Sequence, residues 1–342
     1  MRTALCLVVV AVAVVVAAWH REDARSPGEI LFRTKFTAQT GLGPLFNERA
    51  CSSCHLQPRA GGVGRHGLAT VVRVGKLTAA GFDPLLDDGG PVARAHRTPG
   101  CGGTPGIPAA ANVTSVRNTP PLFGTGLIDA IPDRVIRAGA AAQRGDGIRG
   151  RPSLIRGTDG HLRVGRFGWK ADQPTLDGMV ALALHTELGI TSALAAGGRC
   201  DGDGPEIDHD ALADLTAYVA ELAPPAPRAP ARVFKTTGCA ACHVPSLPAG
   251  ERDAHLYSDL LIHDMGRDLD DRVDQGPANG RDWRTTPLWG LGTRPRYLHD
   301  GRARTLEAAI LAHAGEATTA QRRYRSLPDR DRRTLLNFLR TL

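Results

Sequence analysis

Apolar side chains recur at helical spacing in several segments of this chain. Intervals of three and four residues place them on one face of a helix. The segments are 176–188, 208–222, 305–314 and 328–342. Long stretches such as 56–115 and 141–165 are rich in Gly, Pro and Arg and are predicted to be loops. No series of alternating apolar and polar residues indicates strands, so the pattern predicts a mainly α protein.

Two of these predicted helices carry an ionisable residue on the apolar face. The faces consist of Val180, Ala183, Leu184 and Glu187 in one helix, and of Leu306, Ala309, Ile310 and His313 in the other. A carboxylate or an imidazole in such a place is costly unless it is paired or has a function. Glu187 and His313 are therefore candidate site residues. The ordinary alternatives are an ion pair with an arginine for Glu187 and a hydrogen-bonded core position for His313.

The chain begins with an uncharged apolar run, 3–19, which Arg2 precedes. Small residues at 16–18 allow cleavage after Ala18, which is the pattern of a secretory signal peptide. The run is also just long enough to remain as a membrane anchor. We therefore expect an exported, periplasmic protein whose residues 1–18 are a signal peptide, or an anchor if they are not removed.

A proline-rich stretch, 223–231, is the clearest boundary in the remaining sequence. It holds four prolines, which cannot continue a helix and form a stiff extended linker. The linker separates an N-terminal domain, 19–222, from a C-terminal domain, 232–342. Each of these domains is long enough to form its own compact core.

Two pentapeptides, 51–55 and 239–243, have the form Cys-x-x-Cys-His. This spacing is the attachment signature of c-type haem, in which two thiols bind one porphyrin and the imidazole binds its iron. A single Cys-x-x-Cys would also suit a thioredoxin-like redox pair or half of a zinc site. The repeated motif in an exported chain predicts two covalent haems. Their attachment residues would be Cys51, Cys54, Cys239 and Cys242, and their proximal ligands His55 and His243.

These motifs refine the predicted class to two cytochrome c-like haem domains with long irregular loops. The formal net charge of +7 does not indicate a nucleic-acid partner, because no long run of Lys or Arg accompanies it. Haem propionates would neutralise part of this excess. The low aromatic content, 5%, also suits a core that a porphyrin helps to fill.

Two cysteines remain after the haem motifs and Cys6 of the apolar run are set aside. Cys101 and Cys200 each lie in a Gly-rich segment. An even remainder in an oxidising compartment predicts a structural disulfide, with a redox-active dithiol as the alternative.

Several further segments resemble the bacterial dihaem oxidoreductase family, whose members are described as thiol oxidoreductase-like proteins or peroxidases. The matching segments are 41–47, 117–123, 165–171, 189–192, 257–260, 263–266, 283–285 and 297–307. They occur in consistent order from about residue 28 to the C-terminus. More distantly, the chain resembles bacterial cytochrome c peroxidases and the dihaem enzyme that matures methylamine dehydrogenase.

The resemblance implies a sixth ligand for the second haem. In the resembling peroxidases the position of His313 is a Met ligand, and in the maturation enzyme it is a Tyr. We therefore expect His313 to be the distal ligand of the second haem, with Met265 as the alternative. A packed core methionine is the ordinary explanation for Met265.

The resemblance also implies roles for Glu187 and Trp169. In the peroxidases a Glu at the matching position is the distal acid–base, which moves a proton between the oxygens of peroxide. A Trp about twenty residues earlier lies between the two haems, and Trp169 occupies a similar place here. Ordinary packing and ion pairing are the alternatives. One departure speaks against peroxidase turnover: the peroxidases carry a Gln where this chain has Asp177.

An interhaem calcium ion is a further implication of the resemblance. Its ligands would be the side chain of Asn118 and backbone oxygens near Thr293 and Pro295. The proline is displaced by one residue from the family pattern.

Together, these observations predict a periplasmic dihaem cytochrome oxidoreductase that transfers electrons between its haems and reduces hydrogen peroxide at the N-terminal one. Its partners would be a small electron donor of cytochrome c or cupredoxin type and either peroxide or a protein substrate. A membrane would be involved only through an uncleaved N-terminal segment. The alternatives are a cytochrome that only carries electrons and a thiol/disulfide oxidoreductase that uses Cys101 and Cys200.

Overall fold

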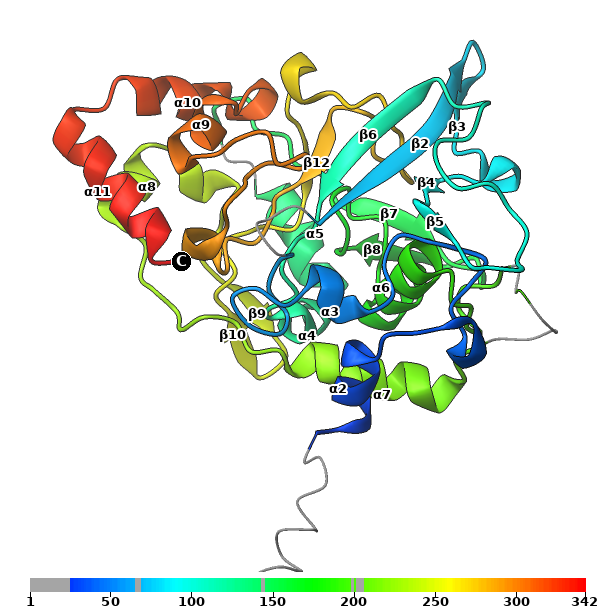
Figure 1. Cartoon of the computed structure of the whole chain (residues 1–342). Coiled ribbons are helices and arrows are strands. Elements are labelled where there is room, and N and C mark those ends of the chain that lie inside the picture. The colour runs from blue at the N-terminus through cyan, green and yellow to red at the C-terminus, as the bar shows by residue number, and fades with distance from the viewer. Residues whose placement is uncertain (1–24, 65–68, 143–144, 198–199, 201–205) are drawn as a thin grey trace, which may run out of the picture.

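The computed structural model describes residues 25–64, 69–142, 145–197, 200 and 206–342 (Figure 1). It is 33% helical, and 19% of it forms strands in several sheets. The predicted class, mainly α with two cytochrome c-like haem domains and long irregular loops, is therefore wrong. The segment assigned to a signal peptide, 1–18, lies outside the described residues. Within the described residues, no helix is long and apolar enough to cross a membrane.

The largest sheet is formed by residues that the pattern assigned to a loop. Its central strand, β2 (Thr70–Thr78), pairs antiparallel with β3 (Gly81–Asp83), β4 (Val92–Ala93) and β6 (Val113–Asn118). Val72 lies opposite Val116 in β6 and Ala93 in β4, so β2 runs between these two strands. β-Branched residues in β2 and β6 favour this extended backbone.

Four two-stranded antiparallel sheets complete the β structure. They pair β1 (Leu45–Phe46) with β5 (His96–Arg97), β7 (Ser153–Arg156) with β8 (Leu162–Gly165), β9 (Leu247–Ala249) with β10 (Arg252–Ala254), and β11 (Ile262–Asp264) with β12 (Asp282–Arg284). Two of these pairs, β7 with β8 and β9 with β10, are hairpins of neighbouring strands, whereas β1 and β11 find partners further along the chain.

The helices fall into two groups along the chain. The first group is α2 (Pro27–Arg33), α3 (Cys51–Cys54), α4 (Thr125–Asp129), α5 (Asp133–Ala141), α6 (Leu176–Ala183) and α7 (His209–Glu221). The second group is α8 (Arg232–Thr236), α9 (Leu306–Leu311), α10 (Thr318–Arg325) and α11 (Asp329–Arg340). Short helical turns are η1 (Ala38–Thr40), η3 (Leu86–Asp88), η4 (Leu184–Leu188), η5 (Cys239–Ala241), η6 (Arg267–Leu269), η7 (Leu291–Thr293) and η8 (Gly315–Ala317).

Two clusters of buried apolar side chains form the main cores. The larger joins α2, α4, α6 and α7 and includes Leu256, Leu260 and Leu261 from beyond the proline-rich stretch. The smaller joins α8, α9, α10 and α11. Figure 1 shows α8 to α11 on one side of the molecule, whereas α2 lies against α7 at another. The domain boundary at 223–231 stays a prediction.

The helical patterns were reliable where the apolar face was continuous. The segment 208–222 forms α7, and Asp208 caps it by accepting a hydrogen bond from Ala211 N at 2.8 Å, as expected. The segment 328–342 forms α11, with Leu335 and Leu339 buried. The other two segments differ in part: α6 gives way at residue 184 to the π-helical turn η4, and α9 ends at Leu311.

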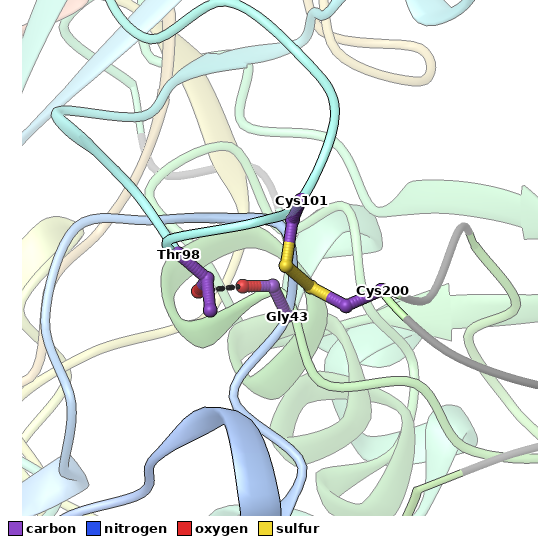
Figure 2. The surroundings of a disulfide bond; sticks show 4 residues. All are labelled: Gly43, Thr98, Cys101 and Cys200. Carbon is purple, nitrogen blue, oxygen red and sulfur yellow. Dashed lines mark hydrogen bonds between the residues drawn. A yellow bond between two sulfur atoms is a disulfide. The ribbon is translucent and has the colours of Figure 1, made fainter.

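A disulfide joins Cys101 to Cys200, with the two Cα atoms 5.0 Å apart (Figure 2). Beside it, the Thr98 hydroxyl donates a hydrogen bond to Gly43 O at 2.6 Å, and Cys101 N donates to Thr98 O at 3.1 Å. The hydrogen bond from Thr98 therefore holds the 98–101 turn close to the segment that leads to the first Cys-x-x-Cys-His motif, and the disulfide ties the same turn to Cys200.

Replacing Cys101 by Ser should lower the free energy of unfolding by about 2–5 kcal/mol, because the unfolded chain is then no longer closed into a long loop. Urea unfolding followed by circular dichroism measures this loss. The Cys101→Ser/Cys200→Ser variant should lose the same amount as either single variant, since each change removes the same link. A double variant as stable as the unchanged protein would contradict a structural role for this disulfide.

Candidate functional site

Two cavities lie beside the two Cys-x-x-Cys-His motifs. The first has a volume of about 260 Å³, and its lining includes Cys51 and Cys54 of α3 and His55, together with Glu187. The second has a volume of about 230 Å³. Its lining includes Cys239, Cys242 and His243 of the second motif, and also His313 and Met265. The walls of both cavities are mainly apolar, which suits a large planar apolar ligand with a few polar groups.

The motif imidazoles have the same arrangement in both cavities. Nδ1 of His55 lies 3.2 Å from Gly62 O, and Nδ1 of His243 lies 2.9 Å from Tyr257 O. A carbonyl oxygen only accepts, so each Nδ1 carries the hydrogen and each Nε2 keeps a free lone pair. Burial lowers the pKa of both imidazoles to about 4. This neutral, oriented form is the one that binds a metal ion.

Three of the four motif thiols are unsuited to thiolate chemistry. Burial raises the pKa of Cys51 to about 11 and the pKa values of Cys54 and Cys239 to about 12. A redox-active pair or a zinc-binding pair needs a thiolate, which a lowered pKa would favour. The protonated thiols and the free Nε2 atoms therefore fit haem attachment better than either alternative.

Glu187 faces the first cavity from η4. Its Oε2 accepts a hydrogen bond from Asn47 Nδ2 at 2.9 Å, and the Thr186 hydroxyl lies 3.2 Å from Oε1. Burial raises the pKa of this carboxyl group, and neighbouring Arg73 and Arg94 only partly oppose the increase. Among the ion pairs of the described residues, none involves Glu187. The alternative of an arginine ion pair is therefore not favoured by this geometry.

Asp177 does not take the place of the glutamine of the resembling peroxidases in this cavity. It is exposed in the first turn of α6, where its Oδ1 accepts a hydrogen bond from Gly178 N at 2.7 Å. Among the described residues that line the first cavity, the acidic ones are Glu48, Asp172 and Glu187.

Trp169 belongs to the walls of both cavities. Its Nε1 donates a hydrogen bond to Asn118 O at 2.9 Å, and its carbonyl oxygen accepts one from Arg284 N at 2.9 Å. The indole thus lies between the two cavities, where the resemblance implied it. Its role remains a prediction.

His313 lies in the turn after α9 and still lines the second cavity. Its Nδ1 donates to Ala309 O at 2.7 Å, which leaves Nε2 free in the same way as in His243. The two imidazoles are close enough for His313 to contribute to the lowered pKa of His243. Met265 lines this cavity as well, so both candidates for the distal ligand are at hand.

The sequence patterns missed a buried charged group beside the second motif. His263 is 2% exposed and lies between Asp259 and Glu316, with Nε2 3.2 Å from Asp259 Oδ2 and Nδ1 2.8 Å from Glu316 Oε2. Burial opposes a charge on this imidazole, but contacts with Asp259, Cys242 and Glu316 raise its pKa to about 12. His263 occurs in segment 263–266, which carried part of the resemblance. Its place in that segment was the feature of the sequence from which His263 could have been identified as a site residue.

Cys242, Asp259 and His263 are also the one metal-type cluster found among the described residues. Cys242 belongs to the second Cys-x-x-Cys-His motif, so a metal ion here would compete with haem attachment. The cluster therefore indicates a hydrogen-bonded histidine at the edge of the cavity rather than a separate metal centre.

Of the three predicted calcium ligands, only Asn118 lines the cavities. Asn118 lies in the wall of both cavities. Thr293 ends η7, where its hydroxyl donates to Gly290 O at 2.9 Å, and Pro295 follows two residues later. Calcium binding stays a prediction.

Residues 194–342 match the family model described as "Di-haem oxidoreductase, putative peroxidase". No curated protein matches the chain. Among solved structures it is similar to hydrazine synthase of Kuenenia stuttgartiensis, pressurised with xenon, at 17% identity and a TM-score of 0.42, over 94% of both chains. That similarity is too low to carry an argument. This match agrees with the resemblance seen in the motifs and supports haem as a cofactor: residues 194–342, less than half of the chain, are similar to the di-haem oxidoreductase family.

Proposed function

We propose that this protein is a periplasmic dihaem c-type cytochrome oxidoreductase that reduces hydrogen peroxide in its first cavity. The observation that carries the proposal is the duplicated arrangement of His55 and His243. Each imidazole is neutral, is oriented by a backbone carbonyl, and lies beside the two cysteines of its motif and an apolar cavity. Haem, when bound, supplies the redox-active iron. A small redox protein of cytochrome c or cupredoxin type would deliver the electrons.

In the first cavity, Glu187 is the group that moves protons. Reduction of peroxide to two water molecules consumes two electrons and two protons, and one proton must pass from one peroxide oxygen to the other. The Glu187 carboxyl group faces the cavity without an ion pair, and Asn47 Nδ2 holds its orientation. In its ionised form it accepts the proton from one oxygen and returns it to the departing one.

In the second cavity, the chain offers an imidazole in addition to that of the motif. His243 and His313 both present a free Nε2, so this cavity is suited to electron transfer rather than substrate binding. Trp169 lines both cavities, so it belongs to the wall that they share and provides a protein path between them. A thiol/disulfide oxidoreductase is less well supported, because neither Cys101 nor Cys200 occurs in the described lining of the two cavities.

The purified exported protein should carry about two covalent haems, because each of its two motifs is intact. Denaturation in alkaline pyridine, followed by absorbance spectroscopy, counts them. A Cys51→Ala/Cys54→Ala variant should retain about one. Loss of the haem to acid–acetone extraction, or one haem in the unchanged protein, would overturn the proposal.

Replacing His313 by Ala should convert one low-spin haem to high-spin and leave the other unchanged, because His313 is the second imidazole in the second cavity. Electron paramagnetic resonance of the oxidised protein measures both spin states. Met265→Ala is the matched control and should leave both haems as they were. If only Met265→Ala produces the high-spin signal, the ligand assignment is reversed.

Replacing Glu187 by Gln should slow the reaction with peroxide by about 10²–10⁴-fold, because a positioned proton-transfer group is lost. The ionised carboxylate is the active form and burial raises its pKa. The rate of the unchanged protein should therefore rise with pH through that raised value, and Glu187→Gln should abolish this rise. Stopped-flow absorbance of the half-reduced protein provides the rates.

Asp177→Asn is the control for this experiment, because Asp177 is exposed and lies outside the described lining of the first cavity. It should leave both the rate and its pH dependence unchanged. If the unchanged protein does not react with peroxide at all, the chain is better explained as a cytochrome that only carries electrons.

A further inference from the structure

We propose that Arg284 and Arg294 form a carboxylate-binding site between the two cavities, where they bind propionate groups from both haems. This inference rests on the proposed presence of two haems. It assigns to two residues a role that neither the motifs nor the family resemblance indicated.

Arg284 is held rigidly in the shared wall. Its side chain is 8% exposed and lines both cavities. The backbone N of Arg284 donates to Trp169 O at 2.9 Å, and its Nε donates to Gly168 O at 2.8 Å. Its Nη1 is buried and has no hydrogen-bond partner among the described residues. Gly168 O therefore occupies only the Nε side of the guanidinium group. The Nη1 side is available to a ligand.

Arg294 approaches the same wall from the end of η7. It also lines both cavities, and its Nη2 donates to Pro287 O at 3.1 Å and to Trp289 O at 2.9 Å. Its Nε is buried and lacks a partner among the described residues. As in Arg284, backbone carbonyl groups bind one nitrogen of the guanidinium group, here Nη2, and leave another, here Nε, free for a ligand.

The two guanidinium groups together create a positive charge that is only partly compensated. Burial lowers the pKa of each to about 10, and Arg294 adds to the decrease at Arg284 through repulsion. Neither takes part in an ion pair within the part of the chain that the structure describes. Asp172 is close enough to attract Arg284, but one of its oxygens accepts a hydrogen bond from Gln275 Nε2 at 3.0 Å.

Buried cations without counter-ions are costly, and guanidinium groups pair best with carboxylates. The missing partner must therefore be anionic and must reach the wall from the cavities. A haem in each cavity would bring propionate carboxylates to this place. The same two positive charges make the wall a poor site for calcium, although Asn118 also lies there.

Two other arginines provide matched comparisons, because each lines only one cavity. Arg73 in β2 belongs to the first cavity, where its Nε is buried without a partner in the described structure. Arg296 belongs to the second. If the position in the shared wall is what matters, removing Arg284 must affect both haems, whereas removing Arg73 or Arg296 must affect one.

The test is a redox titration of the haem-loaded protein, in which absorbance and electron paramagnetic resonance distinguish the two haems. A nearby positive charge favours the reduced iron, so its removal lowers the midpoint potential. Arg284→Gln and Arg294→Gln should each lower both potentials. Arg73→Gln should lower only that of the first haem, and Arg296→Gln only that of the second. Arg284→Lys, which keeps the charge, should restore most of the shift.

Three outcomes would overturn the inference. In the first, Arg284→Gln and Arg294→Gln each shift the midpoint potential of a single haem. In the second, neither variant shifts the midpoint potential of either haem. Alternatively, bound calcium could be found by elemental analysis, with a chelator lowering both potentials of the unchanged protein. If one of the two Gln variants does not accumulate, the Gln variant of the other arginine is read in the same way. Failure of the proposed function is distinguishable, since it would appear earlier as fewer than two haems per chain.

Discussion

Three hydrogen bonds around Trp169 hold together the wall on which both cavities depend. The indole Nε1 donates to Asn118 O, Arg284 N donates to Trp169 O, and Asn118 N donates to His299 O at 2.6 Å. All three use backbone atoms, so they constrain the path of the chain more than the identity of the side chains. They join four segments that are far apart in sequence. Through this junction, Asn118, Trp169 and Arg284 line both cavities.

The chemistry of the site was more predictable than its surroundings. The Cys-x-x-Cys-His motifs fix three residues through local spacing alone, and His55 and His243 both line cavities as expected. Glu187 and His313 were placed by periodicity on faces that do reach these cavities. A helical face is a local property, so His313 still reaches its cavity although α9 ends at Leu311.

The β structure could not be predicted in the same way. β1, β4 and β5 are two residues long, and β2 finds its longest partner in β6, well beyond a hairpin connection. The stability of such strands comes from cross-strand contacts rather than from intrinsic preference. The meeting of Arg284 and Arg294 with Trp169 has the same origin, because topology rather than spacing brings them together. Isolated arginines in a loop-like sequence give no signal of this kind.

The direction of the Glu187 side chain depends on the number of residues in the π-helical turn η4. Such a turn contains one residue more than an α-helical turn would need. Loss of a single residue from 184–188 would let α6 continue regularly and would rotate the following side chains by about 100° around its axis. The carboxyl group would then leave the cavity while every neighbouring residue kept its identity. A family built on this scaffold can therefore gain or lose its proton-transfer group through one insertion or deletion, a change that comparison of residue types alone would overlook.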